Sequence, residues 1–140
     1  MKISYEIKPI KSDINKVYHG LGGFNEPVFG NMVIEEFGCF LRDENQVILG
    51  GATGELVGKV ALVEYVWVEE KLRGQGYGYK IFDVLENSIK DKNITEIHLD
   101  TYSFQAAGFY EKMGFKEVAR YCMMREEKID KIFLIKQLIL

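Results

Sequence analysis

Residues 73–78 read Arg73-Gly74-Gln75-Gly76-Tyr77-Gly78, and this stretch decides how the fold is interpreted. It follows a strand-like run, Leu56 to Val68, and precedes apolar residues that recur at helical spacing up to Ile89. Alternate glycines let a backbone turn tightly and approach an anion, while the first N–H groups of a helix point outward. With the helix dipole and the Arg73 guanidinium, they predict a phosphate-binding cradle. A plain glycine-rich connecting turn is the alternative.

Two common nucleotide loops do not fit this stretch. A P-loop requires Gly-Lys-Ser/Thr, whereas the segment ends Gly78-Tyr79-Lys80. A dinucleotide-binding loop requires a third glycine where Tyr79 stands. The phosphate ligand is therefore expected to be of another kind.

The flanking sequence predicts strands and helices in alternation. Strands are expected over residues 2–8, 32–42, 46–52, 56–68, 94–100, 115–121 and 129–140. Helices are expected from Ser12 or Asp13 through Leu21, over 76–90 and over 105–113, with a loop from Gly22 to Asn31. The order predicts an α+β, three-layer fold: a mixed, mostly antiparallel sheet of six to seven strands with helices on both faces. Strands 56–68 and 94–100 are expected to be parallel, joined by a right-handed crossover.

Composition limits the functional class. The chain has 140 residues, 47% of them apolar, which favours a single domain over residues 1–140. A net charge of −3 disfavours nucleic acid as the main ligand. No signal peptide is evident at Met1 to Ile10, and no apolar run approaches the ~18 residues of a membrane span. Two distant cysteines, Cys39 and Cys122, indicate neither a disulfide scaffold nor a metal site. A cytoplasmic protein without metal or membrane contact is predicted.

A second motif lies downstream, Ala106-Ala107-Gly108-Phe109-Tyr110-Glu111-Lys112-Met113-Gly114-Phe115. With Arg73, Gly76 and Gly78, it resembles the GNAT superfamily of N-acetyltransferases. That family carries Arg/Gln-x-x-Gly-x-Gly/Ala before a helix and Ala-x-x-Phe-Tyr-x-x-x-Gly-Phe further on. The resemblance implies an acyl-CoA N-acyltransferase-like fold in which the fourth and fifth strands, 56–68 and 94–100, splay apart.

The resemblance also implies acetyl-CoA as cosubstrate, held in that gap. The implied cofactor contacts are the strand backbone of Val66, Trp67 and Val68, the pyrophosphate loop Arg73, Gly74, Gln75, Gly76, Tyr77 and Gly78, and finally Ser103 and Tyr110. Ser103 stands where many members place an asparagine that binds pantetheine. Phe104 and Gln105 either touch the cofactor or cap the helix, and the Trp67 side chain is expected in the core.

The catalytic residues implied are an acid and a base. Tyr110 matches the tyrosine that protonates the departing thiolate in many members, although a buried packing role is the alternative. Glu64 is the first candidate for the base, because alternation places it with Val66 and Val68 if no bulge intervenes. A strand N–H near Val66 is expected to stabilise the oxyanion.

The acceptor site is expected at the loop from Gly20 to Asn31, through Phe24, Asn25, Glu26 and Phe29. The predicted function is N-acetyl transfer from acetyl-CoA to a primary amine, of a small molecule or a peptide, by direct attack in a ternary complex. An acyl-CoA-binding module without turnover and a nucleotide-binding protein are the alternatives. The closing strand, Ile132 to Leu140, suggests a possible homodimer through an exposed edge.

Overall fold

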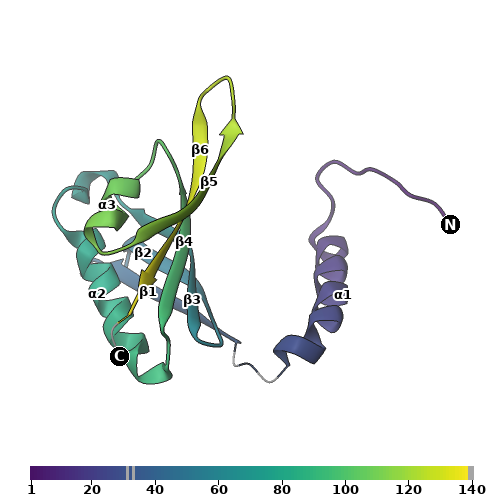
Figure 1. Ribbon diagram of the computed structural model, residues 1–140, viewed down its shortest axis with the longest axis horizontal. Helices are drawn as coiled ribbons and strands as arrows, with labels where there is room; N and C mark the ends of the chain where they lie inside the picture. Colours follow the sequence, from purple (N-terminus) through teal and green to yellow (C-terminus); the bar gives the residue numbers. More distant parts are fainter. Residues whose placement is uncertain (31, 33, 139–140) are drawn as a thin grey trace. The chain divides into compact units, whose positions relative to one another are not determined.

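The computed structural model describes residues 1–30, 32 and 34–138, and the chain divides into two compact units, residues 1–32 and 33–140 (Figure 1). The first unit contains one helix, α1 (Lys11–Phe29), and no residue of that helix is buried. The helix begins where it is expected, but it continues through Gly22, Gly23 and Pro27. The loop expected over these residues is therefore wrong, and its last residue, Asn31, lies outside the described residues. Glycine raises the free energy of a helix without forbidding helical φ and ψ.

The strand expected over residues 2–8 is also wrong, because the structure has irregular backbone there. Alternation of polar and apolar residues describes one strand face but supplies no ladder partner. In the described chain, the backbone of this segment pairs with no other strand. Without inter-strand hydrogen bonds an alternating segment does not become a strand.

The second unit contains a six-stranded mixed sheet in the order β1-β2-β3-β4-β6-β5. Its strands are β1 (Ile34–Arg42), β2 (Ile48–Val57), β3 (Val60–Val68), β4 (Glu96–Tyr102), β5 (Lys116–Met124) and β6 (Ile129–Gln137). The helices are α2 (Tyr77–Ile89) and α3 (Ala107–Lys112), with 3-10 turns at Glu70–Leu72 and Lys90–Lys92. All pairs are antiparallel except β3 with β4, so the mixed sheet and its parallel crossover are confirmed.

The long strand expected over 56–68 is interrupted by a hairpin turn. Leu56 and Val57 end β2, and the chain reverses at Gly58 and Lys59 before β3 begins. Gly58 has φ +59°, a value that glycine adopts without the steric cost of a Cβ. The sequence did not predict this turn, because strand-forming residues flank it and a two-residue loop interrupts the apolar pattern only briefly.

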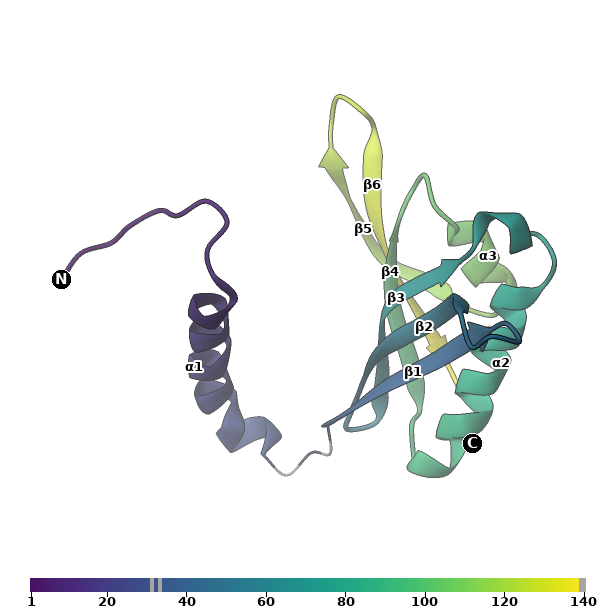
Figure 2. The same cartoon turned by 180° about the vertical axis from the view of Figure 1, so that it is seen from behind.

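Helices α2 and α3 cover the same face of the sheet (Figures 1 and 2). Phe82 of α2 lies among Phe109, Tyr110 and Phe115, with ring centroids 5.9–6.5 Å apart. The buried apolar core consists of Ala52, Leu56, Ala61, Val63, Ile81, Phe82, Leu85, Ile89, Ile94, Ile97, Leu99, Tyr110, Phe115, Ile132 and Leu134. The helix layer of this face is confirmed. Since α1 belongs to the other unit, a helix on the opposite face stays a prediction.

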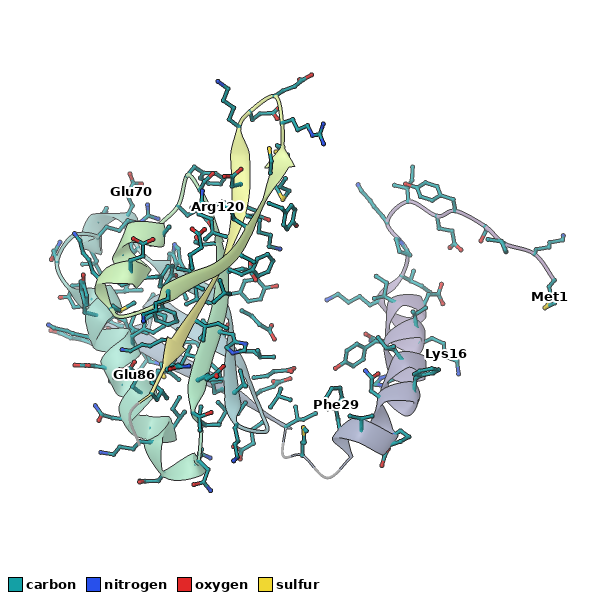
Figure 3. The ribbon with its side chains drawn as sticks, viewed as in Figure 1. Met1, Lys16, Phe29, Glu70, Glu86 and Arg120 are labelled. Atoms are coloured by element: carbon teal, nitrogen blue, oxygen red, sulfur yellow. The ribbon has the colours of Figure 1, made fainter. Side chains whose placement is uncertain are left out.

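The closing strand is not an edge. β6 pairs with β4 on one side and with β5 on the other, so the free edge expected there is wrong. A homodimer stays a prediction. Within the β5–β6 hairpin, Arg120 of β5 (labelled in Figure 3) pairs with Glu117 and with Asp130 of β6. Residues 139 and 140 of the predicted strand lie outside the described residues. No helix within the described chain is long and apolar enough to cross a membrane.

Candidate functional site

β3 and β4 separate after a short region of pairing. Only Val60, Ala61 and Leu62 of β3 pair with β4, through Glu96, Ile97 and His98. Both strands continue beyond these pairs, to Val68 and Tyr102. The splay expected between these two strands is confirmed. Beyond Leu62 the β3 edge that faces β4 has no strand partner in the described chain, so its backbone groups are available to a ligand.

A cavity of about 750 Å³ lies at the separated ends of these strands. Its lining brings together the end of β3, the Arg73–Gly78 loop and the start of α3. The lining residues are Val66, Trp67, Val68, Leu72, Arg73, Gly74, Gly76, Tyr77, Gly78, Tyr79, Phe104, Gln105, Ala106, Phe109 and Tyr110. Nine of the eleven expected cofactor residues are among them; Gln75 and Ser103 are not.

The loop from Arg73 to Gly78 is held by its own side chains. Arg73 Nε donates a hydrogen bond of 3.0 Å to the carbonyl of Val68, at the end of β3. Gln75 Nε2 donates to the carbonyl of Lys71 at 3.0 Å, which explains why this side chain is not in the cavity lining. Glu70, labelled in Figure 3, marks the turn that leads into the loop. These bonds fix the guanidinium beside the cavity mouth.

Two glycines give the loop its shape. Gly74 has φ +74° and Gly76 has φ +85°, both in the left-handed region that other residues enter at a cost. Gly76 precedes the first helical residue of α2, and its carbonyl accepts from Lys80 N. The amides between Gly76 and Lys80 therefore have no acceptor one turn back in the helix. They form the positive end of α2, which suits an anion.

Gly78 of α2 lies against Phe109 of α3. A Cβ on Gly78 would lie 2.7 Å from Cζ of Phe109, closer than packed carbons approach. Phe109 also packs edge-to-face on Tyr79, with centroids 4.9 Å apart. The close approach of α2 and α3 at this glycine sets one wall of the cavity.

Tyr110 lies at the inner end of the cavity. Its residue is 7% exposed and its ring contacts those of Phe82, Phe109 and Phe115. Burial raises the pKa of Tyr110 to about 12, because the phenolate is poorly solvated there. The phenol is therefore protonated at neutral pH, the state that a general acid requires.

Ser103 is engaged elsewhere. Its Oγ accepts from Asp130 N at 2.9 Å, and its own N–H donates to the Asp130 carbonyl at 2.9 Å. These bonds tie the end of β4 to the start of β6. The geometry gives Ser103 an anchoring position beside the site and not one in the cavity lining.

Glu64 lies at a β-bulge. Thr53 of β2 pairs with Tyr65, whereas the next residue, Gly54, pairs with Val63, so Glu64 is the extra residue of β3. A Cβ on Gly54 would lie 1.9 Å from the carbonyl oxygen of Leu62, so the strands approach closely opposite the bulge. The alternation used to place Glu64 therefore does not hold, since a bulge changes the faces of the residues that follow.

A second hollow, of about 530 Å³, opens where β3 and β4 begin to separate. It is lined by Leu62, Val63, Glu64, Tyr65, His98, Leu99, Asp100, Val118, Phe133, Leu134 and Ile135. Glu64 is exposed here, and Tyr110 belongs to the first cavity. Because Tyr65 lines the second hollow and Val66 the first, the two hollows follow one another along β3.

The sequence model of the family described as acetyltransferase (GNAT) domain matches residues 35–117. The chain belongs to the GNAT acetyltransferase family. The matched range contains the bulge, the splayed strands, the glycine loop and Tyr110.

Individual GNAT relatives agree with the match. A Bacillus subtilis (strain 168) protein named as a candidate acetyltransferase is 29% identical over 122 residues, covering 74% of this chain and 81% of the relative. A crystal structure of an acetyltransferase from Bacillus cereus ATCC 14579 superposes with a TM-score of 0.79 at 25% identity, covering 96% and 98% of the two chains. A candidate streptothricin acetyltransferase from Bacillus anthracis str. Ames, solved with acetyl coenzyme A, has a TM-score of 0.59 at 23% identity, covering 78% and 64%.

The residues expected to form the GNAT acceptor site lie in α1. Phe24, Glu26 and Phe29 are exposed within their unit, and Asn25 is half-buried. Phe29, labelled in Figure 3, ends the helix. Because they belong to the first unit, their part in an acceptor site stays a prediction.

Some residues of the GNAT cavity were not expected from the sequence. Phe109 and Tyr79 form its aromatic wall, and Gln105 was assigned no single role. The position of Phe109 could have been predicted, because the second motif places a phenylalanine directly before Tyr110. Trp67 was expected in the core, but its side chain is 47% exposed, because the bulge precedes it and its neighbours in β2 are glycines.

Proposed function

We propose that this chain is a cytoplasmic N-acetyltransferase that transfers the acetyl group of acetyl-CoA to a primary amine by direct attack in a ternary complex. The observation that carries the proposal is the cavity that joins the open β3 edge to the Arg73–Gly78 loop. Residues 1–140 are proposed to act as a single N-acetyltransferase domain. The acceptor is a small molecule or a peptide amine.

The residues present fit acetyl-CoA. The cavity offers suitable groups to two parts of the cofactor. The loop has cationic and amide donors for the pyrophosphate, and β3 has an unpaired strand edge beside Val66 for the pantetheine. A Cβ placed on Gly74 or Gly76 would have no atom within 4 Å, so the loop backbone is open to a ligand. Arg73 and the first amides of α2 bind the pyrophosphate, and the β3 edge from Val66 to Val68 pairs with pantetheine amides.

The chemistry then requires one proton donor and one proton acceptor. As the amine nitrogen attacks the thioester carbon, a backbone N–H near Val66 stabilises the oxyanion. When the C–S bond breaks, Tyr110 donates its proton to the leaving thiolate. Glu64, directly or through a water molecule, takes the proton that the amine loses. The position of Glu64 in the second hollow supports entry of the amine from that side of the splay.

The second hollow contains groups that could receive the acceptor amine. Glu64 and the aromatic wall made by Tyr65 and Phe133 suit an amine that is cationic before it is deprotonated. Phe24, Asn25, Glu26 and Phe29 of α1 are proposed to contribute further acceptor contacts. The name of the Bacillus anthracis neighbour, a candidate acetyltransferase of streptothricin, supports testing amine antibiotics among the acceptors.

One observation favours an alternative function, an acyl-CoA-binding module without turnover. Tyr110 packs against three aromatic rings, as a purely structural tyrosine does. The variant Tyr110→Phe separates the two functions because it retains the ring and removes the proton. In an amine screen that follows CoA thiol release, we expect Tyr110→Phe to lower kcat by about 100-fold, the usual contribution of a general acid, with CoA affinity nearly unchanged.

Tyr121→Phe serves as the matched control, because it makes the same change at an exposed tyrosine of β5 that lines neither cavity. Equal kcat for wild type and Tyr110→Phe would contradict the acid role, and no thiol release with any amine would favour the binding module. Binding of ATP or NAD in preference to CoA would contradict the proposed function as a whole.

A further inference from the structure

Gln105 is fixed between β4 and α3 by three hydrogen bonds. Its Oε1 accepts from Thr101 Oγ at 3.0 Å and from the backbone N–H of Tyr102 at 2.9 Å. Its own N–H donates to the Tyr102 carbonyl at 2.9 Å. Thr101 is buried, so the Gln105 side chain is bonded to a residue on the core side of β4.

These bonds determine which end of the amide faces the cavity. A backbone N–H can only donate, so the atom that meets Tyr102 N must be the carbonyl oxygen of Gln105. With Oε1 turned back to β4, the Nε2 amino group is the remaining polar end, and Gln105 lines the cavity. Among the described residues, Nε2 makes no hydrogen bond, whereas Oε1 makes two. Two N–H donors are therefore available on a residue that lines the cavity.

The position expected from the sequence to bind pantetheine lies outside the cavity lining. Ser103 Oγ accepts from Asp130 N, which ties this side chain to the start of β6. In the β4–α3 connection, Ser103 is therefore bonded to β6, whereas Gln105 lines the cavity.

We propose that Gln105 donates a hydrogen bond from Nε2 to a pantetheine amide carbonyl of CoA, and that Ser103 does not bind the cofactor. Pantetheine carries two secondary amides, so the β3 edge and Gln105 both hold it. Gln105 is then a positioning residue that sets how far the thioester reaches toward Tyr110. The inference rests on the proposed function, since it names how the same cavity binds CoA.

The test compares two ligands by calorimetry: CoA, and 3′-phosphoadenosine 5′-diphosphate, which retains the phosphates and lacks pantetheine. Gln105→Glu keeps the acceptor for Tyr102 N and Thr101 but loses the donor, and Gln105→Met removes the amide without adding charge. For both variants we expect CoA affinity to fall about five- to tenfold, the effect of one lost hydrogen bond. The affinity for the pantetheine-free ligand should stay within twofold of wild type.

Gln137→Glu is the matched control, because it makes the same chemical change at an exposed position of β6 that lines no cavity. Ser103→Ala tests the competing assignment, and its CoA affinity should equal that of wild type. The inference is overturned by unchanged CoA affinity in both Gln105 variants. An equal loss with Ser103→Ala, or a parallel loss for the pantetheine-free ligand, also overturns it. A wild-type chain that binds neither ligand contradicts the proposed function as well, which separates the two failures.

Discussion

Two glycine-rich regions of the chain behave in opposite ways. In α1, Gly20, Gly22 and Gly23 lie within a helix, and a Cβ on any of them would meet nothing within 4 Å in its own unit. In the second unit, Gly54 and Gly78 have a close contact and Gly76 has a positive φ, and a Cβ would make each of these costly. Similar glycine density therefore has two meanings. A glycine is required where the backbone has a positive φ or approaches another atom too closely, and is otherwise replaceable.

The largest effect is expected for Gly54→Ala, opposite the Glu64 bulge. A Cβ there would lie 1.9 Å from the Leu62 carbonyl oxygen, so β2 and β3 would have to move apart. We expect a loss of at least ~2 kcal/mol in the free energy of unfolding, measured with urea. Thr53→Ala is the neighbouring control. A loss below ~0.5 kcal/mol would show that the bulge tolerates a side chain.

The next effect is expected for Gly76→Ala in the phosphate loop. At φ +85° alanine costs about 1–2 kcal/mol, and the loop amides would turn to relieve it. We expect CoA affinity to fall by roughly tenfold, measured by calorimetry. Gly76→Asn should fall less, because asparagine tolerates this conformation. Equal CoA affinity for wild type, Gly76→Ala and Gly76→Asn would show that a glycine is not required at position 76.

A smaller effect is expected for Gly78→Ala, where contact and helix propensity oppose each other. The Cβ would lie 2.7 Å from Phe109 Cζ, while alanine favours the helix by about 1 kcal/mol. We expect a small loss of thermal stability that becomes a gain when Phe109→Leu is also present. A double-mutant cycle measures this coupling, and a coupling near zero would contradict the contact.

The smallest effect, of opposite sign, is expected for Gly22→Ala in α1. Replacing an open helical glycine should stabilise the helix by about 1 kcal/mol. Hydrogen exchange of the α1 amides measures this change, and CoA affinity should equal that of wild type. Faster exchange in the variant would mean that Gly22 has a contact of its own.

The same contrast explains what the sequence predicted well. α2 and the Arg73–Gly78 loop lie where they were expected, because a local glycine pattern and helical periodicity define them. The parallel crossover and the splay followed from element order and the family resemblance. The loop and α2 depend on residues close together in the chain.

Features that depend on distant residues were missed. The Glu64 bulge results from register against Gly54 of the neighbouring strand. The Gln105 amide is oriented by Thr101 and Tyr102, which are near in the chain, but through side-chain hydrogen bonds that no periodicity reveals. Alternation over residues 2–8 predicted a strand, but no periodicity reveals whether a ladder partner is present. The hydrogen bonds of Ser103 are likewise made with Asp130, which lies further along the chain.

The short β3–β4 ladder has a consequence for folding. β1, β2 and β3 form an antiparallel meander, and β4, β6 and β5 form a second antiparallel group, with three residue pairs joining the two half-sheets. The hairpins β1–β2, β2–β3 and β5–β6 close through short turns, whereas the seam between β3 and β4 is bridged by the α2 crossover and joins residues further apart in the chain. Native-state opening should then follow this seam, with each half-sheet exchanging its amides as a separate cooperative unit. The cofactor gap would be the place where the two foldons of this domain meet.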